Sequence, residues 1–472
     1  MTHAANRADE TRIHWKRVLE ATLDERSVPF SADYWSEKDS WSRDRTRAVQ
    51  DEKIRAVAPF LYENSAFYRR RFDRLGVAPS DLTSVESLIA NWPVVTKQEM
   101  MEDALAHPPY GTYTTCGQKE WEDRGWMLFS SSGSTGVPRV FRYTHFDRRF
   151  WEQANARALH SGGIRKGDSA IPMVGFGPHV FAWGVQYTMA AMSLPVIPGG
   201  GLDGPARANL IDRFKPTVLV CTPSYAFYLG RVMQDMGLDP AASSIRWMIT
   251  GGEPFSGVAG TMEKLQGLWD ATAVEFYGCT EASPHCGGYS CPEYQSGAQN
   301  FIHLMDDIQV WETVDAETLA VTPRGQKGLS VCTNLTSESS AQLRFLVGDY
   351  TTLSDEPCAC GRNHTKAMGC MTGRSDDLIN LRGIKFFPVQ IEEAVRAVPG
   401  TGDEFQIHLR KDGDLDVMTV TVEHTDPAAA EAVAREIRSR CEVRSAVQVV
   451  APNALPKSQM KAKRVFDERT RA

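Results

Sequence analysis

The sequence has no long hydrophobic run. No apolar segment approaches the roughly 20 residues that a transmembrane helix needs, and residues 1–17 lack the apolar core of a secretory signal. The 472 residues include only 10 cysteines, too few for the disulfide framework of a secreted scaffold. We therefore expect a cytoplasmic protein with reduced thiols and no membrane partner.

The sequence also has no excess of positive charge. Lys and Arg total 52 against 59 Asp and Glu, a formal net charge of −7. This balance gives no support to nucleic acid or an anionic membrane as a partner. A hydrophobic content of 42% and a charged content of 24% are typical of globular proteins. The length suffices for a large core and a second, smaller one.

No internal repeat is present, but the pattern changes along the chain. Residues 1–110 have mainly helical periodicity. Short apolar runs then alternate with helical segments, which is typical of α/β folds with mostly parallel sheets and ligands at the carboxyl ends of the strands. From residue 308 to residue 347 the pattern is β-like, and about the last 100 residues indicate a small α+β domain.

The most distinctive stretch, residues 129–139, reads FSSSGSTGVPR. Glycines let backbone N–H groups approach an anion closely, and Ser and Thr hydroxyls add donors, as a polyphosphate requires. Such a composition is also typical of a flexible linker, but apolar residues flank this stretch on both sides. It is not a P-loop of the GxxxxGK[ST] kind, because no Lys-Ser or Lys-Thr follows the second glycine.

This stretch and four later motifs resemble, in the same order, the motifs of the adenylate-forming superfamily (acyl-CoA synthetases, peptide-synthetase adenylation domains and luciferases). The later motifs are YGCTE at 277–281, Gly-Asp at 348–349, GRSDD at 373–377 with Arg382-Gly383, and LPKSQMKAKR at 455–464. The phenylacetate–CoA ligase-like branch is the most similar.

The resemblance implies an α/β fold with three parts. Residues 1–373 would form a large N-terminal adenylation domain, with mostly parallel sheets flanked by helices and a β-rich subdomain. Residues 374–377 would be a hinge, with Asp376 as its pivot. Residues 378–472 would form a small, mobile α+β domain that rotates between two half-reactions.

The same resemblance implies a site for ATP. The residues implied to bind the nucleotide are Ser131, Ser132, Gly133, Ser134, Thr135, Gly136, Gly251, Gly252, Glu253, Tyr277, Asp349 and Arg374. The first six would surround the β- and γ-phosphates. Tyr277 and the 251–253 segment would enclose adenine, while Asp349, assisted by Arg374, would accept hydrogen bonds from the ribose hydroxyls.

Four residues are implied to act at the reacting groups. Thr280 would donate to the α-phosphate, and Glu281 would bind Mg²⁺ through hard oxygen. Lys461 would neutralise the carboxylate and the α-phosphate with a compact ammonium. His179 would position the acid, although a core or surface histidine is an equal alternative.

The lysine segment departs from the family pattern at one position. Met460 stands where relatives usually carry glycine, so the backbone there is less free to adopt unusual dihedral angles. Lys457 and Lys463 are competing candidates for the lysine role, and a solvated basic tail is the alternative.

A second resemblance to the same branch concerns cysteine and histidine. Cys291, His303, Cys358 and Cys360 are implied to form a closed, structural Zn²⁺ site, since thiolates and imidazole suit tetrahedral zinc. Cys286, His364 and Cys370 are alternative ligands, and isolated free thiols are the alternative to a site.

Together these features predict an ATP-dependent enzyme that converts a carboxylic acid, aromatic or ring-bearing, to an acyl-adenylate and passes it to coenzyme A. Transfer to an amine or another acceptor, or activation of another oxyacid, is the second interpretation. A catalytically inactive nucleotide- or zinc-binding protein is the third. A homodimer is an expectation from the family.

Overall fold

The computed structural model describes residues 2–23, 36–131, 139–253, 255, 260–282, 286–291, 293, 300–371, 373, 375–382, 384–412, 415–456 and 464–469. The chain forms two compact units. The first combines residues 1–170, 175–196 and 276–368, and the second combines residues 171–174, 197–275 and 369–472. Within the described residues, no helix is both long enough and apolar enough to cross a membrane.

The N-terminal residues are helical, as their periodicity predicts. The elements are α1 (Thr2–Glu20), η2 (Glu37–Ser40), α2 (Arg43–Asn64), α3 (Ala66–Leu75), η3 (Pro79–Asp81), α4 (Val85–Asn91), α5 (Lys97–Ala106) and α6 (Gln118–Arg124). Hydroxyl side chains cap them: Ser42 accepts a hydrogen bond from the Arg45 N–H, and Thr96 forms a reciprocal capping box with Glu99.

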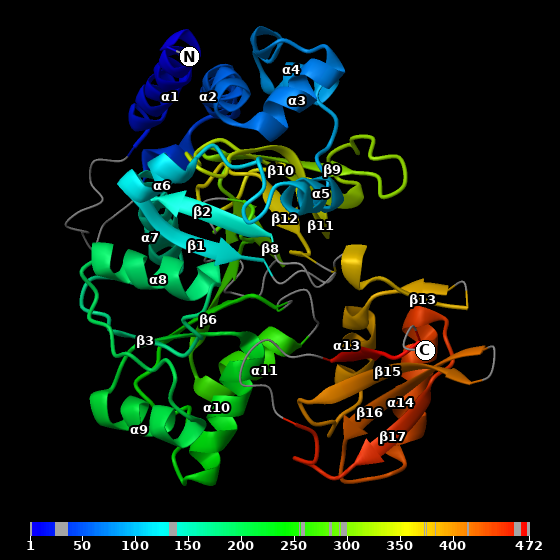
Figure 1. The fold of residues 1–472 in the computed structure, drawn as a ribbon. Helices are drawn as coiled ribbons and strands as arrows, with labels where there is room; N and C mark the ends of the chain where they lie inside the picture. Colours follow the sequence, from blue (N-terminus) through cyan, green and yellow to red (C-terminus); the bar gives the residue numbers. More distant parts are fainter. Residues whose placement is uncertain are drawn as a thin grey trace. The chain divides into compact units, whose positions relative to one another are not determined.

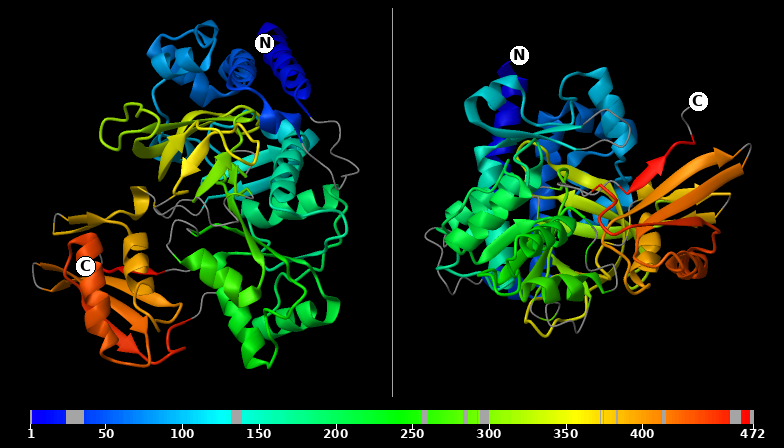
Figure 2. Two further views of the ribbon diagram at one scale, coloured as in Figure 1. Left: turned by 180° about the vertical axis from the view of Figure 1, so that it is seen from behind. Right: turned by 90° about the horizontal axis from the view of Figure 1, so that it is seen from below.

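An aromatic core holds these helices together. The ring of Trp15 in α1 stacks on Phe60 in α2 with centroids 4.6 Å apart, and Figures 1 and 2 show the two helices side by side. The ring of Phe72 in α3 lies 4.4 Å from that of Trp92. All four rings are fully buried, and such pairs contribute beyond their buried area.

A hairpin carries the glycine- and serine-rich stretch. Strands β1 (Gly125–Ser130) and β2 (Val140–Thr144) are antiparallel with Ser130 opposite Val140, so residues 131–139 connect them. Helix α7 (His145–Ser161) follows β2 directly, and Thr144 and Asp147 form its capping box. Helix α8 (Val180–Ala191) packs on α7.

The β-rich part of the first unit is antiparallel. In spatial order its strands are β7 (Gly288–Tyr289), β8 (Phe301–Leu304), β12 (Lys366–Met368), β11 (Gln342–Ser354), β10 (Lys327–Asn334) and β9 (Gln309–Val314). This arrangement places Asp349 of β11 and His303 of β8 in the same unit as the hairpin.

The second unit contains the parallel strands. Strands β4 (Val218–Cys221) and β5 (Trp247–Gly251) pair in parallel and are fully or nearly fully buried. The other elements here are β3 (Ala170–Pro172), α9 (Gly204–Phe214), α10 (Pro223–Asp235), α11 (Thr261–Trp269) and β6 (Thr272–Tyr277). As the sequence predicts, Gly251 and Tyr277 lie at the carboxyl ends of their strands, and β6 runs from the second unit into the first.

The C-terminal residues have the predicted α+β content. The elements are η4 (Ser375–Asp377), β13 (Ile379–Leu381), β14 (Ile384–Phe386), α13 (Pro388–Arg396), β15 (Phe405–Asp412), β16 (Leu415–Glu423), α14 (Ala429–Cys441), β17 (Ala446–Val450) and β18 (Val465–Asp467). Four strands form a sheet in the order β17-β16-β15-β18. Helices α13 and α14 cover one face of it (Figure 2), with Ile391 and Val433 buried against Ile407 and Val420.

A buried charge cluster lies in the first unit. Arg157 of α7 donates to both carboxylate oxygens of Asp307 at 2.9 and 3.0 Å and also to Asp39 in η2. Burial alone raises the pKa of either carboxyl group, but the Arg157 guanidinium holds both pKa values below the usual range. One cation from α7 therefore compensates two buried anions from distant segments.

Replacing Arg157 is expected to be strongly destabilising. Arg157→Met leaves Asp39 and Asp307 buried without their main cation, so the free energy of unfolding should fall by about 3–5 kcal/mol in urea denaturation. Because the folded pKa values of the two carboxyl groups lie below the unfolded value of about 3.9, the deficit should shrink as the pH falls below about 4.

The control uses the same helix. Arg149 forms an exposed ion pair with Glu20 at 3.3 Å, and Arg149→Met should cost less than about 1 kcal/mol. Equal losses from the two substitutions would contradict the importance of the buried cluster.

Candidate functional site

Backbone hydrogen bonds hold the two ends of the glycine- and serine-rich stretch in place. The Ser131 N–H donates to the Arg139 carbonyl at 2.9 Å, which closes the base of the hairpin, and the Ser130 N–H donates to Pro178 O at 2.9 Å. Five of the residues predicted to bind phosphate lie outside the described residues: Ser132, Gly133, Ser134, Thr135 and Gly136. Of this set, the structure therefore places Ser131 alone.

The YGCTE motif lies directly beside the hairpin. Arg139 Nη2 donates to Glu281 Oε1 at 2.8 Å, and both side chains are less than 10% exposed. The hydroxyl of Tyr143, in β2, donates to the Thr280 carbonyl at 2.5 Å. The base of the phosphate stretch and the predicted Mg²⁺ ligand therefore meet, although 142 positions separate Arg139 from Glu281.

The predicted ribose ligand contacts the same motif. The Tyr277 hydroxyl donates to Asp349 Oδ2 at 2.6 Å, and the Asp349 N–H donates to Ser330 Oγ at 3.2 Å. Burial, together with the Asp349 carboxylate, raises the pKa of Tyr277 well above its usual range, so the phenol keeps its proton and serves as a donor. Ser131, Arg139, Glu281, Tyr277 and Asp349 are thus joined by direct contacts or short stretches of chain.

The predicted adenine segment 251–253 lies in the second unit, after β5. Gly252 has φ +83°, a conformation that favours glycine. The Glu253 carboxylate accepts hydrogen bonds from the Ser224 hydroxyl at 2.9 Å and from the Ser224 N–H at 3.2 Å, in the first turn of α10. This contact fixes the segment within its own unit.

His179 is exposed at the N-terminus of α8. It occupies the N-cap position, and its side chain makes no capping hydrogen bond. Beside it, the Trp183 indole N–H donates to Gly177 O at 2.9 Å, and the rings of Phe176 and Trp183 meet edge to face at 4.9 Å. The histidine is therefore available to a ligand, with two aromatic rings on the same segment.

The predicted lysine, its two competitors and the predicted ribose helper cannot be placed. Lys457, Lys461, Lys463 and Arg374 lie outside the described residues, and of Asp376 only the backbone, in η4, is described.

The described residues that flank the lysine segment are firmly bound. The Leu455 N–H donates to Glu423 Oε1 at 2.9 Å, Arg464 forms an ion pair with Glu392 at 2.6 Å, and the Ile407 N–H donates to Arg464 O at 2.7 Å. Sequence reasoning missed these anchors.

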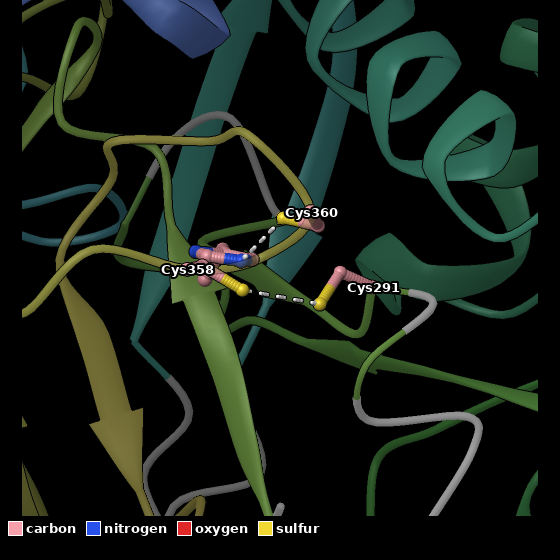
Figure 3. A group of neighbouring side chains, drawn as sticks. Cys291, Cys358 and Cys360 are labelled. Atoms are coloured by element: carbon pink, nitrogen blue, oxygen red, sulfur yellow. Dashed lines mark hydrogen bonds between the residues drawn. The ribbon is translucent and has the colours of Figure 1, made fainter. Parts of the chain in front are cut away.

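A cysteine–histidine cluster lies in the first unit (Figure 3). The ligand atoms of Cys291, His303, Cys358 and Cys360 all lie within 4.8 Å of one another. The Cys291 and Cys358 sulfurs are 4.0 Å apart, and Cys360 Sγ is 3.3 Å from His303 Nε2. Strand β8 supplies the histidine, and loops on either side of the strand supply the thiols.

These distances suit one tetrahedral zinc ion. With Zn–S bonds of about 2.3 Å and tetrahedral angles, two sulfur ligands lie about 3.8 Å apart, close to the separation observed between Cys291 and Cys358. A hydrogen bond from Cys291, together with His303, holds the pKa of Cys360 well below its usual range, which favours the thiolate. Burial lowers the pKa of His303, which favours the neutral imidazole that a metal requires.

The alternative ligands have other contacts. His364 Nε2 lies 3.0 Å from Asp39 Oδ1 and 3.1 Å from Arg157 Nη2, within the buried charge cluster. The Cys286 thiol donates to Gly288 O at 3.4 Å. Among the described residues, the metal-sized group consists of the four predicted side chains and includes neither His364, Cys286 nor Cys370.

Comparison with known proteins identifies the family. The sequence profile described as AMP-binding enzyme matches residues 78–332, and the profile of the AMP-binding enzyme C-terminal domain matches residues 383–469. Phenylacetate-coenzyme A ligase of Aromatoleum evansii is 32% identical over 441 residues, covering 91% of this chain and 96% of its own. The enzyme of the same name from Thermus thermophilus is 30% identical over 459 residues, covering 92% and 99%.

Solved structures of 2-hydroxyisobutyryl-CoA ligase have the same fold. The postadenylation state with its 2-HIB-AMP ligand has a TM-score of 0.83 at 25% identity and covers 94% of this chain and 96% of that one. The thioesterification state with 2-HIB-AMP and CoA has a TM-score of 0.69 at 26% identity, with coverages of 94% and 96%. The chain therefore belongs to the AMP-binding enzyme family of adenylate-forming ligases, in its phenylacetate–CoA ligase-like branch.

Proposed function

We propose that this AMP-forming acid–CoA ligase acts on an aromatic or ring-bearing carboxylic acid. The chain activates the acid with ATP, releases pyrophosphate and transfers the acyl group from the acyl-adenylate to coenzyme A. Two curated relatives are named for phenylacetate. The rings of Phe176 and Trp183 beside the exposed His179 support a ring-bearing acid here too.

One observation carries the assignment of the nucleotide to specific residues. Contacts at hydrogen-bond distance connect Arg139 to Glu281 and Tyr277 to Asp349, and both pairs lie in one compact unit. Each pair contains one carboxylate with a defined partner, which is the pre-organisation that a charged ligand requires. In this proposal Ser131 and the hydroxyl-rich residues 132–136 donate to phosphate oxygens, and Thr280 donates to the α-phosphate.

The remaining contacts of the proposal are those that the family motifs imply. Asp349, oriented by the Tyr277 hydroxyl, accepts from the ribose hydroxyls with Arg374 beside it, and the 251–253 segment packs against adenine. The buried carboxylate of Glu281 is the hard-oxygen ligand for Mg²⁺, which when bound neutralises phosphate charge. His179 positions the acid.

The C-terminal residues complete the proposal. Residues 378–472 form a separate domain on a hinge at 374–377, and residues 1–373 form the adenylation domain. Lys461 then approaches the carboxylate and the α-phosphate for adenylation and leaves for thioester formation. The described residues on both sides of the lysine segment are anchored, Leu455 to Glu423 and Arg464 to Glu392.

The activity is tested with a panel of acids. We expect ATP-dependent pyrophosphate release with aryl acids and stoichiometric consumption of coenzyme A, with less turnover of short aliphatic acids. If pyrophosphate is released in the presence of an amine and no coenzyme A is consumed, the acyl acceptor is an amine instead of coenzyme A. No pyrophosphate release with any acid would indicate a protein that has lost catalysis.

The lysine assignment is tested by substitution. Lys461→Ala should lower acid-dependent ATP–pyrophosphate exchange by about 100-fold or more, because it removes the charge that stabilises the transferring phosphoryl group. Thermal unfolding should not change. Lys457→Ala is the matched control and should retain most of the exchange; the reverse pattern would transfer the role to Lys457.

Zinc at the cysteine–histidine cluster is a proposal of its own. Cys291, His303, Cys358 and Cys360 fill all four tetrahedral positions, so the ion would be structural and would bind no substrate. It would connect β8 to the loops that contain the three cysteines.

Elemental analysis is expected to find about one zinc per chain. Cys360→Ser should lose the metal and unfold at a lower temperature, because binding free energy at such sites contributes to folding. Cys286→Ser, a buried thiol outside the cluster, should keep its zinc. A wild-type protein that contains no zinc, and whose unfolding temperature is not lowered by Cys360→Ser, would rule out the zinc site.

A further inference from the structure

The ion pair between Arg139 and Glu281 is buried next to the phosphate stretch. Their side chains are 8% and 7% exposed, and the guanidinium approaches the carboxylate to 2.8 Å. Arg139 is also the residue whose carbonyl accepts the Ser131 N–H. The carboxylate proposed for Mg²⁺ thus has a cation beside it.

The Arg139 guanidinium has more N–H donors than the one that contacts Glu281. It carries five N–H groups, and Glu281 takes the hydrogen bond from Nη2. Arg139 Nε is buried and has no hydrogen-bond partner among the described residues. A buried donor without an acceptor is costly, so an anion that bound beside Arg139 would gain from this N–H group.

A structural ion pair in the same unit provides the contrast. Arg344 donates through Nε and Nη2 to both oxygens of Glu312 and through Nη1 to the carbonyls of Ile89 and Trp92. The side chains of Arg344 and Glu312 are each 5% exposed, similar to those of Arg139 and Glu281. Equal burial therefore does not explain the single hydrogen bond between Arg139 and Glu281.

We propose that Arg139 is the exchangeable counter-ion of Glu281. In the free protein it neutralises this carboxylate, and when the triphosphate of Mg·ATP binds, its donors turn to phosphate oxygens and leave the carboxylate to the metal. The inference rests on the proposed function and adds a ligand for the nucleotide. It also implies that Glu281 is closed to Mg²⁺ alone, so metal and nucleotide enter together.

Charge and geometry support the exchange. Guanidinium forms bidentate hydrogen bonds with phosphate as readily as with carboxylate. The triphosphate brings several negative charges and its own divalent cation, so both members of the pair gain a new partner at once. Neither charge is left buried alone at any stage, which avoids the cost of breaking a buried ion pair.

The test is a double-mutant cycle on ATP binding, measured by calorimetry in EDTA. Glu281→Gln should bind metal-free ATP about tenfold more tightly than wild type, because the carboxylate no longer competes for Arg139. Arg139→Gln should bind it about tenfold or more weakly, since one charge-assisted contact is lost. In the Arg139→Gln background, the gain from Glu281→Gln should be much smaller.

A second readout uses metal without nucleotide. Mn²⁺ alone, followed by electron paramagnetic resonance, should bind Arg139→Gln about tenfold or more tightly than wild type. Additive effects in the cycle, together with equal Mn²⁺ binding, would overturn the proposal and leave the pair a structural one.

Controls separate this inference from folding and from the proposed function. Glu312→Gln removes the carboxylate of a similarly buried pair and should lower thermal stability without changing ATP affinity. Arg139→Lys keeps a charge beside Glu281 and serves if Arg139→Gln does not fold; its ATP affinity in EDTA should also fall. If the wild type fails to bind ATP even with Mg²⁺, the proposed function fails. If it binds ATP but the variants match it, the counter-ion exchange alone fails.

Discussion

A cation beside a buried carboxylate offsets the cost of its burial, and the first compact unit uses this pairing repeatedly. Asp39 and Asp307 share Arg157, Glu312 pairs with Arg344, and Glu338 lies within 3.3 Å of Arg12, Lys16 and Arg124. In each case the partners come from segments far apart in the sequence. The pairings therefore do more than neutralise charge: they fix which helices and strands can lie together.

The candidate nucleotide site contains a pairing of the same kind. Glu281 is as buried as the structural carboxylates, and its cation comes from the residue that closes the phosphate stretch. Asp349 has an uncharged donor, the phenol of Tyr277. The candidate site thus follows the packing pattern of its surroundings, in which a buried or half-buried carboxylate has a defined donor from another segment.

The order of elements and the nucleotide motifs could be predicted because both are local in sequence. Helical periodicity, strand–turn alternation and the YGCTE and Gly-Asp motifs each lie within a few consecutive residues. The contacts of Arg139 and Tyr143 with the YGCTE motif could not be predicted, because they join residues 142 and 137 positions apart. The Cys-x-Cys segment and the family resemblance together selected Cys291 and His303, and in the structure these four side chains lie together without Cys286 or His364. Lys461 stays a prediction from sequence.

The loop that carries Cys358 and Cys360 continues directly into residues that hold the N-terminal region. The Asn363 N–H donates to Asp39 O at 2.8 Å, and His364 contacts the same aspartate's carboxylate. A zinc ion at the cluster would therefore be held only a few residues along the chain from Asn363 and His364, which contact Asp39 in η2. Oxidation of a single thiolate would release the ion, and both this loop and η2, which contacts it, would then be held less tightly.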